Sequence, residues 1–185
     1  NMILKDIWLD VKAVQARDPA ARSALEVLLL YQGVHALIWH RFAHWFYKHH
    51  MFFIARLISQ LARFFTLIEI HPGAQLGHGI LIDHGAGVVI GEGLNKGKRH
   101  PTLGSNVTVG AGAKILGAFE VGDNCSIAAN SVLLKPLENN VTAVGVPARP
   151  VKKDGIPIPK KKYASVESLG HNLRRIEELE EKVRE

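Results

Sequence analysis

Between Leu103 and Leu133 the chain reads LGSNVT VGAGAK ILGAFE VGDNCS IAANSV L, a repeat with a period of six residues. A branched aliphatic residue opens every hexad, and glycine or another small residue often follows it. A period of six fits neither an α-helix nor an alternating strand, and it is typical of a parallel β-solenoid with three short strands per coil. We therefore predict that these aliphatic side chains stack into inward-facing ladders.

The same spacing begins before this stretch and is interrupted once. The residues predicted to form the ladders are Ile70, Leu76, Ile82, Val88, Leu103, Val109, Ile115, Val121, Ile127 and Leu133. Because fifteen residues separate Val88 from Leu103, which is not a multiple of six, we predict an excursion loop near 93–101. This loop is basic and rich in glycine, and we favour a functional role over a merely solvated loop. Cys125 falls on a corner position of the repeat, which predicts a small buried side chain rather than a nucleophile.

Helices are predicted before the repeat. Apolar residues recur there at spacings of three and four, which predicts amphipathic helices ending near Asp18-Pro19, then over 20–50 and over 51–66. Eleven of the 13 aromatic residues precede residue 66, whereas 13 of the 17 glycines lie between residues 73 and 122, so the two parts are built differently.

The predicted fold class is therefore α+β. We expect a helical N-terminal domain over 1–68, a hexapeptide-repeat solenoid over 69–150, and a basic linker with an amphipathic helical tail over 151–185.

The composition excludes several classes of protein. A single cysteine rules out an internal disulfide and a multi-cysteine zinc site, and it favours a reducing, cytoplasmic compartment. Arg56 and Arg63 interrupt the most apolar stretch, 51–70, so a membrane span is not expected. The formal charge of +6 could attract nucleic acid, but the lysines cluster over 152–162 beside one aromatic residue, without the stacking platforms that such binding needs.

Two histidines, His40 and His44, are four residues apart on one predicted helix face. This spacing would suit a metal ion, but the acidic residue of the His-Glu-x-x-His zinc signature is missing between them. We favour structural or surface histidines and predict no metal site.

Several motifs together resemble the bacterial serine acetyltransferase family. The matching segments are RDPA at 17–20, IHPGA at 70–74, IDHGAGVVIGE at 82–92, KRHP at 98–101, GAGAKILG at 110–117 and GVPAR at 145–149. The resemblance implies a left-handed parallel β-helix that assembles as a trimer or a dimer of trimers, with active sites between neighbouring subunits. It also implies transfer of an acetyl group from acetyl-CoA to the hydroxyl of L-serine, giving O-acetyl-L-serine for cysteine synthesis.

The resemblance assigns roles to residues of this chain. It implies that His84 is the general base, because a serine hydroxyl attacks only once its proton is removed. Glu69 stands where the family carries an aspartate, and it is the expected carboxylate that orients His84. The resemblance also implies the contacts with the charged groups of serine. Carboxylates are expected to bind its ammonium group, and basic side chains are expected to bind its carboxylate. These expected contacts are Asp18 and Asp83, then Arg99 and His100.

The resemblance also places the donor and raises the question of a partner. Acetyl-CoA is expected as co-substrate along the groove between two solenoids, with Ala111 and Ala129 against its pantetheine arm, although simple corner packing explains both alanines as well. Family members pair with cysteine synthase through a tail that ends in isoleucine. This chain ends with Val183-Arg184-Glu185, so its terminus does not support that partner.

One departure from the family leaves alternatives open. Family members carry about one further coil, ending in a Gly-Gly-Thr-Gly run, where this chain joins Glu92 directly to Gly93. Loss of a coil would move His100 relative to His84, and catalysis tolerates misplacement of only about 0.5 Å. The alternatives to a serine acetyltransferase are a hexapeptide acyltransferase with another acceptor and a catalytically impaired scaffold.

Overall fold

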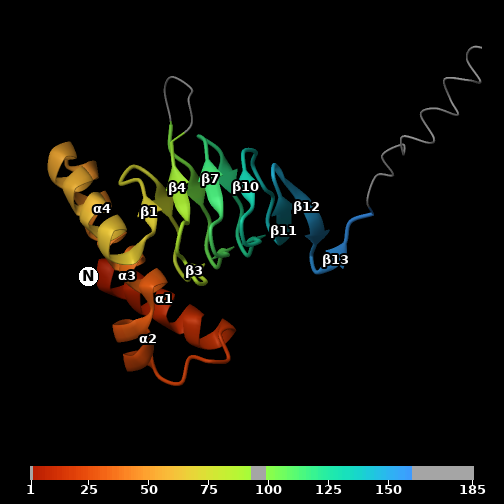
Figure 1. Ribbon diagram of the computed structural model, residues 1–185, viewed down its shortest axis with the longest axis horizontal. Helices are drawn as coiled ribbons and strands as arrows, with labels where there is room; N and C mark the ends of the chain where they lie inside the picture. Colours follow the sequence, from red (N-terminus) through yellow and green to blue (C-terminus); the bar gives the residue numbers. More distant parts are fainter. Residues whose placement is uncertain (1, 93–98, 160–185) are drawn as a thin grey trace, which may run out of the picture.

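The computed structural model describes residues 2–92 and 99–159, in which four helices precede a stack of short strands (Figure 1). The helices are α1 (Met2–Arg17), α2 (Ala24–Leu30), α3 (Gln32–Lys48) and α4 (Phe52–Thr66). The predicted first and third helices are confirmed. The predicted continuous helix over 20–50 is wrong, because Tyr31 adopts an extended conformation (φ −90°, ψ 107°) and divides it into α2 and α3.

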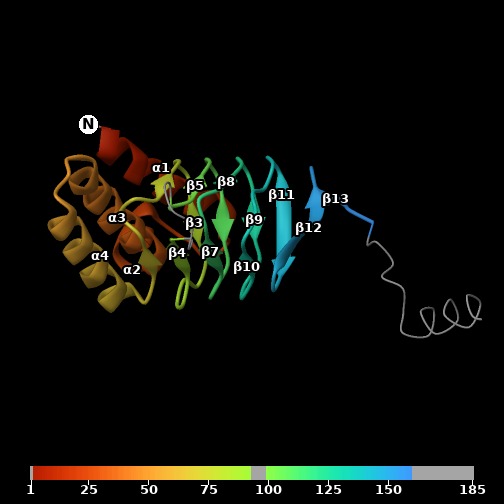
Figure 2. The same ribbon diagram turned by 90° about the horizontal axis from the view of Figure 1, so that it is seen from above.

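The strands form three sheets that together build a solenoid, and their pairings are parallel except for the two that involve residues 148–153. They are β1 (Glu69–Ile70), β2 (Gln75–Leu76), β3 (Leu81–Ile82), β4 (Val89–Gly91), β5 (Thr102–Leu103), β6 (Thr108–Val109), β7 (Lys114–Leu116), β8 (Glu120–Val121), β9 (Ser126–Ile127), β10 (Val132–Leu133), β11 (Val141–Gly145), β12 (Ala148–Lys153) and β13 (Ile156–Pro157). The sheet orders are β1-β4-β7-β10, β2-β5-β8 and β3-β6-β9-β11-β12-β13. Each of the first three coils contributes one strand to each sheet, and the helices gather at the end of the stack opposite β13 (Figure 2).

The strand register confirms the predicted ladders except at one position. Pairings that place the predicted aliphatic residues one above another include Leu76 with Leu103, Leu103 with Val121, Ile82 with Val109, Val109 with Ile127, and Ile115 with Leu133. The assignment of Val88 to a ladder is wrong, because Ile90 pairs with Ile70 and Ile115.

The difference at Val88 has a simple structural cause. The corner between Ile82 and Ile90 is two residues longer than the corresponding corner between Val109 and Ile115. This longer corner contains Asp83 and His84.

A second corner carries a ladder of amides. Asn106, Asn124, Asn140 and Asp154 all have φ between 50° and 60° and lie one above another. Each asparagine donates its side-chain N–H to the next residue of the ladder, at 3.3, 2.9 and 2.8 Å. The ladder extends to Asp154, and β12 and β13 extend the sheet to Pro157, so the prediction of a linker from residue 151 is wrong at its start. The predicted tail helix and most of the loop near 93–101 lie outside the described residues.

The helices are attached to the first coils by polar contacts. The Arg41 guanidinium donates to the buried Asp10 carboxylate at 2.6 and 2.9 Å, and Asp10 accepts the N–H of Ile80 at 3.1 Å. His44 donates its Nδ1–H to the Pro72 carbonyl at 2.8 Å, and burial lowers the pKa of His40 to about 3. His44 therefore attaches α3 to the solenoid and His40 is buried in the same helix, as their structural interpretation predicts.

Other parts of the core agree with the sequence. Cys125 is fully buried at its corner, as predicted.

Across the described ranges, every helix is too short or too polar to cross a bilayer.

Candidate functional site

One cavity of about 340 Å³ brings three of the predicted site residues together. It lies between the helices and the first coil, and its lining includes Asp18, Tyr31, Asp83 and His84. Asp18 follows α1, whereas Asp83 and His84 follow β3 on the longer corner. The fold therefore gathers two carboxylates and an imidazole from distant parts of the chain.

The break between α2 and α3 shapes one wall of this cavity. Because Tyr31 leaves the helical conformation, its hydroxyl reaches Asp18 and donates to Oδ2 at 2.8 Å. Asp18 Oδ1 accepts the N–H of Ala20 at 2.8 Å. The Ala20 N–H and the Tyr31 hydroxyl hold the pKa of Asp18 below its usual value, so this carboxylate is a fixed anion at neutral pH.

A glycine sets the distance between α3 and the solenoid. A Cβ atom on Gly33 would lie 2.3 Å from the carbonyl oxygen of Ile82, closer than real contacts allow. The absence of a side chain lets the first turn of α3 lie directly against β3. Gly33 therefore holds Tyr31 close to the corner that carries His84.

His84 projects from the surface of the subunit. Its φ of 46° lies in the left-handed region that non-glycine residues seldom adopt, and its side chain is 89% exposed. Nε2 lies 3.8 Å from Oδ1 of Asp83. The longer corner thus presents an imidazole beside a carboxylate, open to a second molecule.

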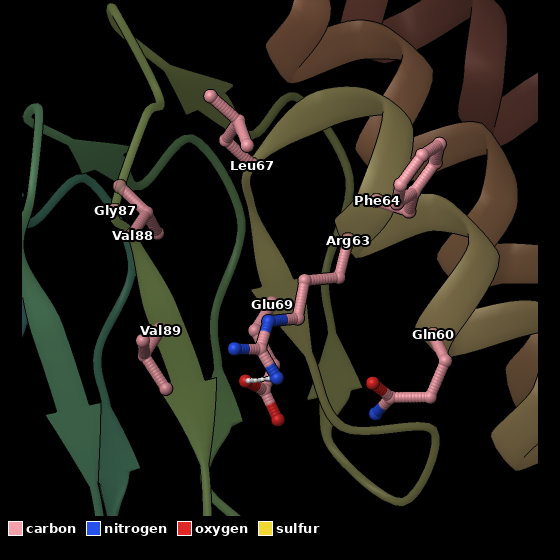
Figure 3. A pocket seen from close by; sticks show the side chains of 8 residues that line it. All are labelled: Gln60, Arg63, Phe64, Leu67, Glu69, Gly87, Val88 and Val89. Atoms are coloured by element: carbon pink, nitrogen blue, oxygen red, sulfur yellow. Dashed lines mark ion pairs between the residues drawn. The ribbon is translucent and has the colours of Figure 1, made fainter.

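Glu69 lies in a different cavity, of about 740 Å³, between α4 and β4. Its carboxylate forms ion pairs with Arg63 at 3.4 Å and with Arg56 at 3.7 Å, and Figure 3 shows the Arg63 guanidinium directed at it. Within this subunit the Glu69 carboxylate is therefore held by arginines of α4, and Glu69 does not line the cavity that contains His84.

Arg99 and His100 line a third cavity, of about 470 Å³, with Tyr47, His71 and Glu92. Within one subunit they are not brought to the cavity that His84 lines. Arg99 forms an ion pair with Glu92, and the His100 ring stacks on His71 with ring centroids 3.9 Å apart. Burial lowers the pKa of His100, which keeps its imidazole neutral.

A metal ion could be considered at His71, Glu92 and His100, whose ligand atoms lie within 4.8 Å of one another. However, the backbone N–H of Gly73 donates to Nδ1 of His71 at 3.0 Å, so the proton of the neutral ring is on Nε2. Nε2 lies 2.9 Å from Glu92 and donates to it. A metal at Nε2 would need the other tautomer and would break the bond from Gly73, so the hydrogen bonds oppose a metal site.

Ala111 and Ala129 lie on the same edge of the solenoid as His84. Each follows its ladder residue by two positions, as His84 follows Ile82, and the ladder residues are in register. Ala129 is exposed and Ala111 is half-buried. Successive coils are about 4.8 Å apart, so this edge offers a row of small residues beside the imidazole.

The sequence analysis did not identify four residues that shape these sites: Tyr31, Gly33, His71 and Glu92. The first two were hidden because the apolar spacing around them continues through the helix break. His71 and Glu92 fall inside family motifs, but nothing in their spacing shows that they meet in space. The one sequence feature that could have pointed to them is the interruption of the repeat after Glu92.

Comparisons with known sequences agree with this architecture. Residues 1–38 match the family described as serine acetyltransferase, N-terminal, and residues 100–135 match bacterial transferase hexapeptide (six repeats). A serine acetyltransferase of Helicobacter pylori strain J99 is 52% identical over 168 residues, which cover 80% of this chain and 98% of that protein. One from Synechococcus elongatus is 46% identical, covering 84% of this chain and 72% of that protein.

Solved structures give the same result. A serine acetyltransferase from Neisseria gonorrhoeae has a TM-score of 0.70 at 34% identity. The match covers 82% of this chain and 66% of that one. One from Brucella abortus in complex with coenzyme A has a TM-score of 0.69 at 37% identity, covering 81% of this chain and 68% of that one. The sequence identity, the hexapeptide solenoid and the cavity around His84 together show that this chain belongs to the serine acetyltransferase family.

Proposed function

We propose that this chain transfers the acetyl group of acetyl-CoA to the hydroxyl of L-serine, with His84 as the general base. The observation that carries this proposal is the cavity in which Asp18 and the corner with Asp83 and His84 line the same space. The names of the relatives support it: one structural relative is a complex with coenzyme A and another is a complex with serine.

The reaction needs two proton transfers, one from the serine hydroxyl to His84 and one from His84 to the leaving thiolate. Neutral His84 removes the proton from the serine hydroxyl as the oxygen attacks the thioester carbonyl. The C–S bond then breaks, and the imidazolium returns the proton to the departing thiolate of coenzyme A. The products are O-acetyl-L-serine and free coenzyme A, and no other reactant is required.

Two carboxylates in the cavity fit the ammonium group of serine. Asp18 is fixed by Ala20 and Tyr31, and Asp83 is exposed beside His84. A cation between two anions gains charge-assisted hydrogen bonds from both. With the ammonium group bound there, the hydroxyl of the amino acid would lie next to the imidazole.

The substrate carboxylate requires basic residues from a second subunit. Arg99 and His100 line a different cavity of the same subunit, so we propose that the solenoid is a left-handed β-helix in a trimer, where these residues meet His84 of a neighbour. The exposure of the His84 side chain supports a site completed by another chain. Ala111 and Ala129 would then face the pantetheine arm of acetyl-CoA along the groove.

Glu69 keeps its proposed role as the carboxylate that orients His84, but it must first exchange Arg63 for the imidazole. Its backbone position supports this role, because the Glu69 N–H donates to the carbonyl of Val88 at 2.9 Å, and Val88 lies between the His84 corner and β4. The variant Glu69→Gln tests this: an orienting carboxylate predicts a fall in kcat of roughly 100-fold, and a mere partner of Arg63 predicts almost none.

The proposed function is tested by following thiol release from acetyl-CoA with L-serine. We expect serine-dependent release by the wild type and a loss of about 100-fold or more in His84→Ala. His78→Ala is the matched control, because His78 is also exposed on the first coil. Equal rates for His84→Ala and wild type would reject the proposal, and a better acceptor without an α-carboxylate would favour another acyltransferase.

A further inference from the structure

The corner that holds His100 contains four side chains that form a continuous chain of contacts. His71 follows β1, Glu92 follows β4, and Arg99 and His100 precede β5. The rings of His71 and His100 stack with an interplanar angle of 10°. This cluster lies on coils one and two, on a different corner from His84.

The hydrogen bonds of His71 fix both its tautomer and its orientation. Because the Gly73 N–H donates to Nδ1, the proton of the neutral ring must be on Nε2, from which it donates to Glu92. Burial, followed by the neighbouring His100, lowers the pKa of His71 to about 4, so the ring is neutral at pH 7. His71 is therefore a rigid hydrogen-bond donor rather than a mobile cation.

Glu92 connects this donor to the arginine. One carboxylate oxygen accepts from His71 and the other forms the ion pair with Arg99. Glu92 and Arg99 also stand on either side of residues 93–98, so their contact joins the two ends of that segment. A guanidinium carries five N–H donors and the Arg99 side chain is half exposed, which leaves donors free for a ligand.

His100 is held by packing on two sides. Its ring stacks on His71, and the Tyr47 ring of α3 meets it edge-on with centroids 6.0 Å apart. A Cβ atom on Gly73 would lie 2.4 Å from Cδ2 of His100, so only glycine leaves room for this position. The ring is thus fixed by residues that do not belong to its own segment of chain.

We propose that His71 and Glu92 are positioning residues, which hold Arg99 and His100 in the arrangement that binds the carboxylate of the amino acid substrate. This inference rests on the proposed function. It adds a reason for the placement: the first coil, through His71, orients Arg99 and His100, which precede β5 on the next coil. The effect is on substrate binding rather than on the proton transfer at His84.

The variant Glu92→Gln separates charge from hydrogen bonding. Glutamine still accepts from His71 but no longer carries the charge that holds Arg99. We expect the KM for L-serine to rise roughly tenfold, with kcat and the KM for acetyl-CoA changing less than about twofold, because the lost contact is a charge-assisted one on the acceptor side. His71→Phe keeps a flat ring against His100 but removes the N–H, and it should raise the same KM.

Glu138→Gln is the matched control. Glu138 forms an exposed ion pair with Lys153 on a distant part of the solenoid, so this variant makes the same chemical change away from the site. If Glu92→Gln and Glu138→Gln have the same KM for serine, the positioning role is overturned.

The same assay keeps the two proposals apart. If His84→Ala is inactive while Glu92→Gln resembles Glu138→Gln, the proposed function stands and the positioning role fails. If the wild type releases no thiol in response to serine, the proposed function fails, and the positioning role fails with it. A selective rise in the serine KM of both Glu92→Gln and His71→Phe supports the positioning role.

Discussion

His84 and His100 lie on different corners of one solenoid and in opposite surroundings. His84 is 89% exposed on a corner lengthened by two residues, with Asp83 at 3.8 Å. His100 is packed between His71 and Tyr47, beside the ion pair of Glu92 with Arg99. The imidazole of His84 is exposed and that of His100 is held by packing. This difference is expected if each active site is assembled from two subunits, one providing His84 and the other providing His100.

Mixing two inactive variants tests most directly whether His84 and His100 of one site come from different subunits. We expect His84→Ala to lose activity by about 100-fold because the general base is removed, and His100→Ala to lose roughly 10- to 100-fold in kcat/KM because a contact to the substrate carboxylate is removed. Co-expressed in equal amounts, they should recover about a quarter of wild-type activity, because each site then draws its two histidines independently from two subunits. No recovery would show that both histidines act within the same chain.

A substitution at Gly33 can change the packing around the His84 corner while leaving the residues of that corner unchanged. In Gly33→Ala the new Cβ would lie 2.3 Å from the Ile82 carbonyl oxygen, so α3 must move away from β3. We expect a loss of about 1–3 kcal/mol in the free energy of unfolding, measured by urea denaturation, together with lower activity.

Gly91→Ala is the control for that experiment, since the nearest atom to its new Cβ is 3.5 Å away. Equal stability of the two variants would contradict the close approach of α3.

Acid should destabilise the fold through the histidines whose pKa values are lowered by burial. The folded-state pKa values of His71 and His40 are about 4 and about 3, below the value near 6.5 of an unfolded chain. Between pH 6.5 and 4 the unfolded state therefore binds more protons, so this stabilisation is complete above pH 6.5 and is lost as the pH falls. The free energy of unfolding should decrease by at most about 1.4 kcal/mol per pH unit for each ring.

His71→Phe sharpens this test, because it removes one of the rings whose pKa is lowered. Its unfolding free energy should depend less steeply on pH than that of the wild type. An unchanged slope would mean that His71 is not protected from protonation by its surroundings.

The smallest expected effect is at the wall of the His84 cavity. Tyr31→Phe removes one of the two donors to Asp18 while keeping the ring. We expect the KM for serine to rise about two- to fivefold with little change in thermal stability, because one hydrogen bond to a charged group is lost. An unchanged KM would show that Asp18 does not depend on Tyr31 to meet the substrate.

The fold was predictable to the extent that it depends on local repetition. Ladder positions such as Val109, Ile115 and Ile127 follow from a six-residue period, because each coil repeats the same burial. The prediction failed at Val88, where the corner is longer, and at Tyr31, where an apolar pattern continues across a helix break. In both places the local pattern is regular and the backbone is not, since contacts with other elements decide the conformation.

The candidate site was predictable residue by residue, but its assembly was not. The residue types of His84, Asp83 and Asp18 suit the proposed chemistry, and the family motifs mark their positions. The sequence carries no measure of distance between Glu69 and His84, and the ion pair with Arg63 arises only because α4 packs beside β1. The chain of contacts from His71 to Arg99 likewise depends on which corners of neighbouring coils coincide.

The sequence by itself determined the periodic solenoid, the helical region before it and the kinds of side chain available for catalysis, because periodicity and residue chemistry are written along the chain. Only the tertiary structure decided that His84 faces outward, that Tyr31 reaches Asp18, and that His71 and Glu92 hold the segment carrying His100. Those features depend on packing between elements far apart in the sequence, where a two-residue insertion or a single glycine changes which groups meet.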